Sequence, residues 1–404
     1  MRRLQSVLLG AFVGLGLTAS IAHATVLPPY SQTNLVSNLA LPGVVQDPNL
    51  QNPWGVSESA TSPLWISDQA AGVATLYTLN GLTATPAGGP LVVTIPALPT
   101  PPNGPTGQVN NSIGGVATNS FMITQSGTLA PAHFIFANLN GTISAWTAQP
   151  PAAAQIQVTT PGATYTGLAI GGTVSVPFLY AANGAQNRID VFDGTFTNVN
   201  GTPQFAGKFA NPFSSDGLVP FNVQNIGGDI YVTYAPATIG ANRTPQTMAT
   251  AGQGAVAEFD TNGNLLRTVI NFDQIGSHLA SPWGIALAPA GFGPFGGDLL
   301  VGNFSYSLGE IDAYNPVTGA FLGTLDSNAA WQGLWALTFG SGSASGGSSD
   351  ILYFTTGLNA ETNGLFAALS VAPEPSTLAL LGAGLLSLYA WRRRSSRRRD
   401  EAAG

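Results

Sequence analysis

The side chains that could do chemistry are few, and the most regular set is a series of four oxygen-bearing residues. Each of them follows a short apolar run directly, and together they are Asp68, Asn138, Asn183 and Asn303. Carboxylate and amide oxygens that converge on one point suit Ca²⁺, so calcium is the one cofactor that the sequence suggests. A structural role competes with it, because Asp and Asn at strand ends accept hydrogen bonds from backbone N–H groups and tolerate turn conformations. We expect the structural role.

Motifs of catalysis are missing from the rest of the sequence. There is no G-x-S-x-G, no H-E-x-x-H and no phosphate-binding Gly-Lys-Thr pattern. The chain has no Cys, which excludes disulfides, thiolate nucleophiles and thiolate metal ligands. The glutamates of the body show no paired spacing typical of acid–base catalysis, and they are Glu58, Glu258, Glu310 and Glu361. We therefore expect a protein without catalytic activity, and an enzyme is the alternative.

The elements that must position these residues are short β-strands. Residues 281–325 contain four apolar runs, at 283–287, 298–302, 309–314 and 320–325, separated by Gly, Pro, Asn and Asp. Runs of this length, rich in β-branched and aromatic residues, predict strands joined by hairpins. The 404 residues include 50 Gly and 29 Pro, and only 8% are charged, which also favours many short strands over surface helices.

The four-strand pattern repeats six times. Trp54, Trp283 and Trp335 open equivalent first strands, with about 50 to 60 residues per repeat, which predicts a six-bladed β-propeller. The second repeat is expected to begin with a strand at 114–118 after a Pro-rich link at 96–111, and the third to end with a strand at 204–209. The sixth repeat lacks a fourth strand, and residues 34–39 can supply it and so remove an open sheet edge.

The expected topology places two kinds of connection on one face. Connections from the second to the third strand, and from each fourth strand to the next repeat, lie on the same side of the disc, where propeller ligands usually bind. The candidate ligand-contact residues on this face are Asn49, Asp216, His278, Trp331 and Gln332. Exposed loops without any ligand are an equally simple interpretation.

The two ends of the chain carry targeting signals. Residues 1–24 have two arginines, an apolar run and an Ala-His-Ala ending, which predicts a secretory signal peptide. Residues 371–404 contain Pro373, Glu374 and Pro375, an apolar helix expected at 377–391 and an arginine cluster, which would keep the C-terminus cytoplasmic. The body, residues 25–370, has four basic residues against sixteen acidic ones, so nucleic acid is not an expected partner.

The order of Pro-Glu-Pro, short apolar helix and arginine cluster resembles the PEP-CTERM sorting tail. This resemblance implies recognition by an exosortase-type membrane protease and a link to an extracellular polysaccharide matrix. It also implies export, transient anchoring in the inner membrane, and a final place in the periplasm, at the cell surface or outside the cell.

The body resembles an uncharacterised family of exported six-bladed propellers with NHL-like repeats. Residues 179–193 resemble the NHL blade, and the motifs Asn-Pro-Trp-Gly at 52–55, Ser-Pro-Trp-Gly at 281–284 and Gly-Leu-Trp at 333–335 carry the wider resemblance. These motifs indicate the fold more clearly than any chemical activity. The first expectation is a non-catalytic binding or matrix-associated surface protein, with a polysaccharide or a surface protein as partner. The alternatives are a metal-dependent lactonase or hydrolase, a chemistry of related six-bladed propellers, and a purely structural surface protein.

Overall fold

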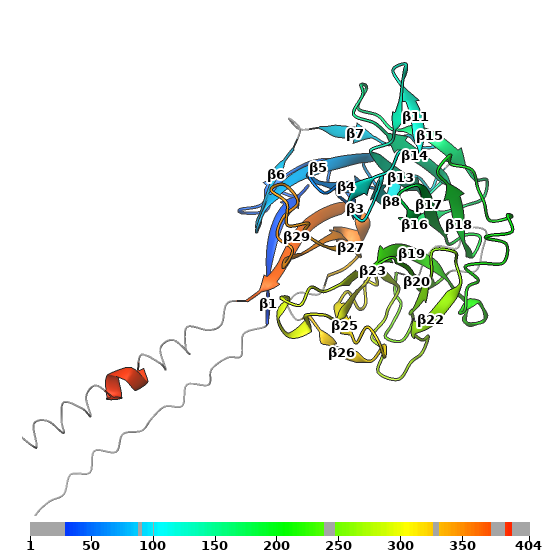
Figure 1. Ribbon diagram of the computed structural model, residues 1–404. Helices are drawn as coiled ribbons and strands as arrows, with labels where there is room; N and C mark the ends of the chain where they lie inside the picture. The colour runs from blue at the N-terminus through cyan, green and yellow to red at the C-terminus, as the bar shows by residue number, and fades with distance from the viewer. Residues whose placement is uncertain are drawn as a thin grey trace, which may run out of the picture. The chain divides into compact units, whose positions relative to one another are not determined.

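The six-bladed β-propeller is confirmed. The computed structural model describes residues 29–87, 91–99, 101–237, 247–325, 331–372 and 384–389. Residues Pro28–Glu374 form one compact unit, the propeller, in which the blades are arranged around a common centre (Figure 1). The remaining residues belong to a second unit, of which the described residues 384–389 are helical.

The first three blades differ in their strand number. Blade 1 consists of β3 (Pro53–Ser57), β4 (Leu64–Asp68) and β5 (Val73–Asn80), with both β6 (Thr83–Pro86) and β7 (Val92–Thr94) paired to β5. Blade 2 consists of β8 (Pro105–Asn110), β13 (Phe134–Asn138), β14 (Thr142–Trp146) and β15 (Gln155–Thr159). Blade 3 has β16 (Tyr165–Thr173), β17 (Val176–Asn183) and β18 (Arg188–Asp193).

The last three blades follow the four-strand pattern. Blade 4 consists of β19 (Leu218–Ile226), β20 (Asp229–Pro236), β21 (Ala255–Phe259) and β22 (Leu265–Ile270). Blade 5 consists of β23 (Pro282–Leu287), β24 (Leu299–Asn303), β25 (Ile311–Tyr314) and β26 (Phe321–Thr324). Blade 6 consists of β27 (Leu334–Phe339), β28 (Leu352–Gly357), β29 (Asn363–Val371) and, from the N-terminal side, β1 (Tyr30–Ser37) with β2 (Val45–Gln46).

The ring is closed by the N-terminal strand, as the sequence predicts. Strand β1 pairs antiparallel with β29, from Tyr30 opposite Val371 to Ser37 opposite Leu365, so the two strands lie side by side (Figure 1). Tyr30 and Val36 are almost fully buried, which fixes the register of the added strand. Closure therefore depends on residues more than 300 positions apart in the chain.

Two predicted strands are wrong. The first strand of blade 2 is β8, inside the link expected at 96–111, and the expected strand at 114–118 instead contributes β10 (Val116–Ala117), paired with β9 (Ser112–Ile113). A second hairpin, β11 (Met122–Gln125) and β12 (Thr128–Pro131), follows before β13. Residues 204–209 form turns, not the expected fourth strand of blade 3, and Phe205 and Phe209 insert into the core beside blade 4.

Short helical turns occur in three connections of the described residues. They are η1 (Ser214–Asp216), η2 (Gly293–Phe295) and α1 (Leu358–Glu361).

The core lies between the blades. Within the described residues, each pair of neighbouring blades encloses its own cluster of buried apolar side chains. The inner strands β3, β8, β16, β19, β23 and β27 contact one another in a ring around the centre. A Cβ atom at Gly55 would lie 2.4 Å from the Thr106 backbone oxygen, and one at Gly107 would lie 2.2 Å from the Leu168 nitrogen. Glycine is required there because neighbouring inner strands approach so closely.

Candidate functional site

One side of the central channel is filled by tryptophans. Trp54, Trp283 and Trp335 are the second residues of β3, β23 and β27, and each is at most 5% exposed. The rings of Trp54 and Trp335 stack with centroids 3.5 Å apart, and Trp283 meets both edge-on at 6.1 and 5.8 Å. Phe221 and Phe304 complete this aromatic cluster. The tryptophans at the blade starts therefore serve packing, and they close the channel on the side where the inner strands begin.

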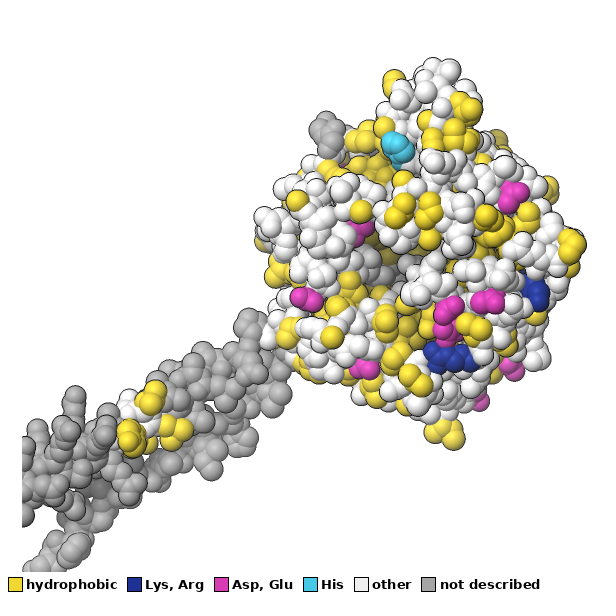
Figure 2. All heavy atoms as spheres, viewed as in Figure 1, with side chains coloured by type: hydrophobic (Ala, Val, Ile, Leu, Met, Phe, Trp, Pro, Cys, Tyr) yellow, Lys and Arg dark blue, Asp and Glu magenta, His cyan; other side chains and the backbone are white. Residues whose placement is uncertain are grey.

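The opposite side of the channel opens into a hollow of about 620 Å³. Its wall comes from the far ends of inner strands and the connections after them, including residues 56–58, 108–110, 168–170, 224–225 and Thr338. A hollow is visible near the centre of the face drawn in Figure 2, on which charged side chains are few. We refer to this space as the channel hollow.

The wall of the channel hollow combines amide and hydroxyl side chains with apolar ones. Gln108 is 4% exposed, and its Nε2 donates hydrogen bonds to the backbone oxygens of Gly55 and Trp65. Its Oε1 is buried without a hydrogen-bond partner among the described residues, and so is the Oγ of Ser57. A buried acceptor without a partner costs about 1 to 3 kcal/mol. Gln108 and Ser57 both line the hollow, although these two atoms are themselves buried.

Glu58 is the acidic residue of this wall. Its carboxylate accepts a hydrogen bond of 2.9 Å from the Ser341 hydroxyl, across the junction of blades 1 and 6. Burial raises the pKa of Glu58 to about 7, while the bonds to Ser341 lower it. No Lys or Arg is found among the described residues that line the channel hollow. The site is suited to a neutral, polar ligand and offers no countercharge for a phosphate.

The four predicted calcium ligands are placed at equivalent strand ends. Each is fully buried, and each bonds inside its own blade. Asn138, Asn183 and Asn303 accept hydrogen bonds from the backbone nitrogens of Gly104, Thr164 and Ala280, at 3.1, 3.3 and 2.9 Å respectively. Asp68 accepts a hydrogen bond of 2.7 Å from the Thr75 hydroxyl, and burial raises the pKa of Asp68 well above the usual range. None of the four lines the channel hollow.

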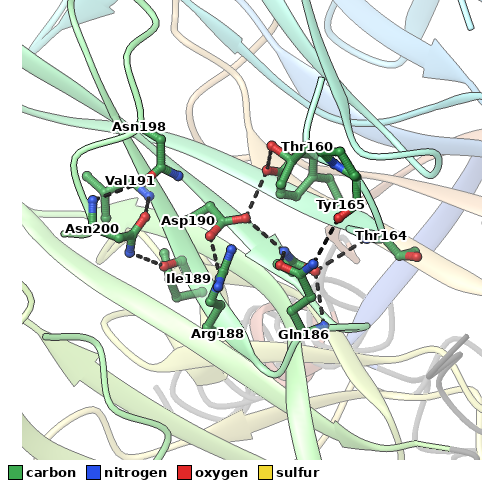
Figure 3. A network of polar contacts seen from close by, with 12 residues as sticks. Thr160, Thr164, Tyr165, Gln186, Arg188, Ile189, Asp190, Val191, Asn198 and Asn200 are labelled. Carbon is green, nitrogen blue, oxygen red and sulfur yellow. Dashed lines mark hydrogen bonds and ion pairs between the residues drawn. The ribbon is translucent and has the colours of Figure 1, made fainter. Parts of the chain in front are cut away.

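Blade 3 shows what this position does (Figure 3). Asn183 Nδ2 donates to Asp190 Oδ2 at 2.8 Å, and the Tyr165 hydroxyl lies 2.9 Å from the same oxygen. The second oxygen of Asp190 pairs with Arg188 Nε at 2.6 Å. Every polar atom of the Asp190 carboxylate is thus satisfied, and the network ties strands β16, β17 and β18 together.

The candidate residues on the loop face do not converge. Asn49, His278 and Gln332 lie in connections between blades, as does Asp216 at the end of η1, so they share the face that the topology predicts. Among the described residues, no hydrogen bond or ion pair joins these four to one another.

Trp331 is occupied by the protein itself. It is 4% exposed, its ring lies 5.2 Å from that of Phe354, and its Nε1 donates to Gln32 Oε1 at 2.8 Å. His278 is not enclosed in this way, because its side chain is 41% exposed. Its Nδ1 lies 3.7 Å from Glu310 Oε2.

The sorting motif Pro373, Glu374 and Pro375 lies outside the described residues, as do residues 1–24 and most of the helix expected at 377–391. Within the part of the chain that the structure describes, no helix is long and apolar enough to cross a membrane.

The channel hollow escaped sequence reasoning. Part of its wall comes from polar residues that end inner strands, and these look like ordinary loop residues in the sequence. Outside the hollow, Glu310 and Asp312 lie near His278 in blade 5, and they had a visible signal. They are two residues apart in a predicted strand, and such residues point to the same face.

A sorting motif and two viral proteins resemble parts of this chain. Residues 371–394 match the PEP-CTERM protein-sorting motif. Uncharacterized protein R648 of Acanthamoeba polyphaga mimivirus is 30% identical over 298 residues, which are 72% of this chain and 68% of that protein. Uncharacterized protein L690 of the same virus is 28% identical over 347 residues, or 83% and 84% of the two chains.

Solved propellers resemble the body only loosely. The gluconolactonase XC5397 from Xanthomonas campestris is 14% identical, with a TM-score of 0.34 over 59% of this chain and 82% of that one. The Pan2 WD40 domain from Neurospora crassa is 12% identical, with a TM-score of 0.40 over 83% and 95%. Likenesses at this level carry no argument about function.

Proposed function

We propose that this chain, which belongs to the family of mimivirus protein R648 and carries a PEP-CTERM sorting motif, is a non-catalytic binding protein of the cell surface or extracellular matrix. Its ligand is a neutral, hydroxyl-rich molecule, and an extracellular polysaccharide fits this description. The PEP-CTERM motif implies export and sorting at the membrane by an exosortase. We also propose the export route, in which residues 1–24 act as a signal peptide and the C-terminal helix anchors the chain transiently in the inner membrane.

One observation carries the proposal, namely the wall of the channel hollow, which has Glu58 as its one acidic residue and no Lys or Arg among the described residues. The amide side chains of Asn110, Gln224 and Asn225 lie in this wall together with the hydroxyl residues Ser57 and Thr338. Sugar hydroxyls both donate and accept hydrogen bonds, which matches such a set. A volume of about 620 Å³ lies in the range of small-molecule sites.

A metal-dependent hydrolase is the weaker candidate. It would need oxygen ligands that face a substrate-sized space, whereas the four strand-end residues bond within their blades and stay out of the hollow's wall. Catalytic turnover by the chain would therefore count against the proposal.

The test is a calorimetric titration of the full-length chain with neutral gluco-, manno- and chito-oligosaccharides. Gln224 is exposed and lines the hollow, so Gln224→Trp should block it without disturbing the core and reduce affinity at least tenfold. Gln204→Ala, an exposed glutamine in the turns after blade 3, is the matched control and should bind like the wild type. The proposal fails if no oligosaccharide binds, if Gln224→Trp binds unchanged, or if the chain hydrolyses a lactone or glycoside.

A further inference from the structure

Blade 5 contains a group of three side chains that could hold a metal ion. His278, Glu310 and Asp312 each place one ligand atom so that all three atoms lie within 4.8 Å of one another. His278 comes from the connection between β22 and β23, Glu310 immediately precedes β25, and Asp312 belongs to it. This group lies apart from the channel hollow, whose described wall contains none of the three.

The imidazole is held with its Nδ1 toward the carboxylates. Its ring stacks on Phe321 with centroids 4.0 Å apart and planes at 12°. The backbone of His278 is fixed on both sides, because its N–H donates to the Tyr314 hydroxyl and its carbonyl accepts from Asn303 Nδ2. Nδ1 itself is buried and has no hydrogen-bond partner among the described residues, since Glu310 Oε2 is 3.7 Å away.

Blades 3 and 5 share the same polar framework. Asn303 Nδ2 donates to Asp312 Oδ2 at 2.9 Å, as Asn183 Nδ2 does to Asp190 Oδ2 at 2.8 Å. In both blades the Asn also accepts a backbone N–H from the preceding connection. Asp312 and Asp190 therefore occupy equivalent positions, and so do Glu310 and Arg188, which lie two positions before them.

The equivalent positions carry opposite charges. Arg188 neutralises Asp190 in blade 3, whereas Glu310 adds a second carboxylate beside the fully buried Asp312 in blade 5. Among the ion pairs of the described residues, His278 is the one partner of this carboxylate pair. The cation that blade 3 supplies at this position is thus replaced in blade 5 by a carboxylate, which leaves two carboxylates and one imidazole facing one another.

We propose that His278, Glu310 and Asp312 bind one divalent transition-metal ion, for which Zn²⁺ is the best-suited choice. One imidazole nitrogen and two carboxylate oxygens form a mixed donor set that zinc accepts, with bonds of about 2.0 to 2.2 Å. The ligand atoms would have to approach one another by about 1 Å, and the half-exposed side chains of His278 and Glu310 leave this movement open. Thr324, whose hydroxyl donates to Asp312 Oδ1 at 2.8 Å, orients that ligand from outside the set.

The experiment measures zinc binding by the full-length chain after treatment with a chelator. Equilibrium dialysis with metal analysis should give one Zn²⁺ per chain, and thermal unfolding should shift upward when zinc is added. His278→Gln and Glu310→Gln should each lose stoichiometric binding. His133→Gln, the matched histidine outside the group, should keep it.

Glu310→Arg is the sharpest variant, because it copies the arrangement of Arg188 and Asp190 into blade 5. It should abolish zinc binding while leaving the metal-free chain at least as stable as the wild type. The proposal is overturned if the wild type binds no zinc, if the three substitutions in the group leave binding intact, or if His133→Gln removes it.

Discussion

Glu58 should make the stability of the propeller depend on pH in a way that one substitution removes. Burial raises its pKa from the ordinary value of 4.5 to about 7. Below pH 4.5 the carboxyl is protonated in both the folded and the unfolded chain, so it contributes no difference. Between pH 4.5 and 7 the unfolded chain releases its proton and the folded chain keeps it, so the free energy of unfolding falls as the pH rises. Above pH 7 the loss is complete.

The magnitude follows from the shift. A shift from 4.5 to about 7 corresponds to about 3 kcal/mol at 1.36 kcal/mol per pKa unit. The carboxylate is partly exposed, and screening by solvent reduces the expected loss to about 1 to 2 kcal/mol. Glu58→Gln keeps an acceptor for the Ser341 hydroxyl but cannot ionise. It should match the wild type at pH 4 and exceed it by this amount at pH 8.

The assay is urea unfolding of wild type and Glu58→Gln at half-unit intervals from pH 4 to pH 9. Their difference isolates Glu58 from other groups, such as Asp312, whose pKa burial also raises to about 7. Ser341→Ala is a second variant: it removes a hydrogen bond that lowers the pKa, so the transition should move to higher pH. A difference that stays constant across the range would refute the reasoning.

Two further predictions concern the closure of the ring and of the channel. Trp335→Ala removes a fully buried ring that stacks on Trp54 and Phe304, so the free energy of unfolding in urea should fall by about 3 to 5 kcal/mol. Trp335→Phe keeps an aromatic ring and should lower it by less. Equal losses in the two variants would show that stacking is not the cause. Deletion of residues 29–37 removes β1 and leaves the edge of β29 open, so the chain should lose its cooperative unfolding transition and aggregate during size-exclusion chromatography. An unchanged, monomeric chain would mean that β1 is dispensable.

The architecture was predictable because its signals are local and repeat. Short apolar runs between turn residues predict the strands, and the tryptophans that open three inner strands set the register. The added N-terminal strand followed from counting, since the sixth repeat was one strand short, and the pairing of β1 with β29 confirms it.

The two errors in the strand prediction have a common physical cause. Strand β8, PTGQVN, lacks an apolar alternation because Gly107 meets the neighbouring inner strand and Gln108 bonds backbone atoms there. Residues 204–209 look like a strand, but Phe205 and Phe209 are four positions apart and reach the core from turns. Tertiary packing decided both cases against the local pattern.

The candidate sites were harder to predict, because they depend on which blades meet. Glu58 and Ser341 are remote in sequence and come together across the junction of two blades. The proximity of Glu310 to His278 likewise depends on how the connection before β23 folds over β25. Only the spacing of Glu310 and Asp312 was available in advance.

The central claim is that ligands bind in the channel hollow and not on the opposite loop face. Hydrogen–deuterium exchange of the full-length chain, with and without a neutral oligosaccharide that binds in the titration, tests this most directly. The account predicts slower exchange at residues 56–58, 108–110 and 224–225, with no change in the connections that carry Asn49 and Gln332. Protection of those connections, with an unchanged hollow, would contradict it.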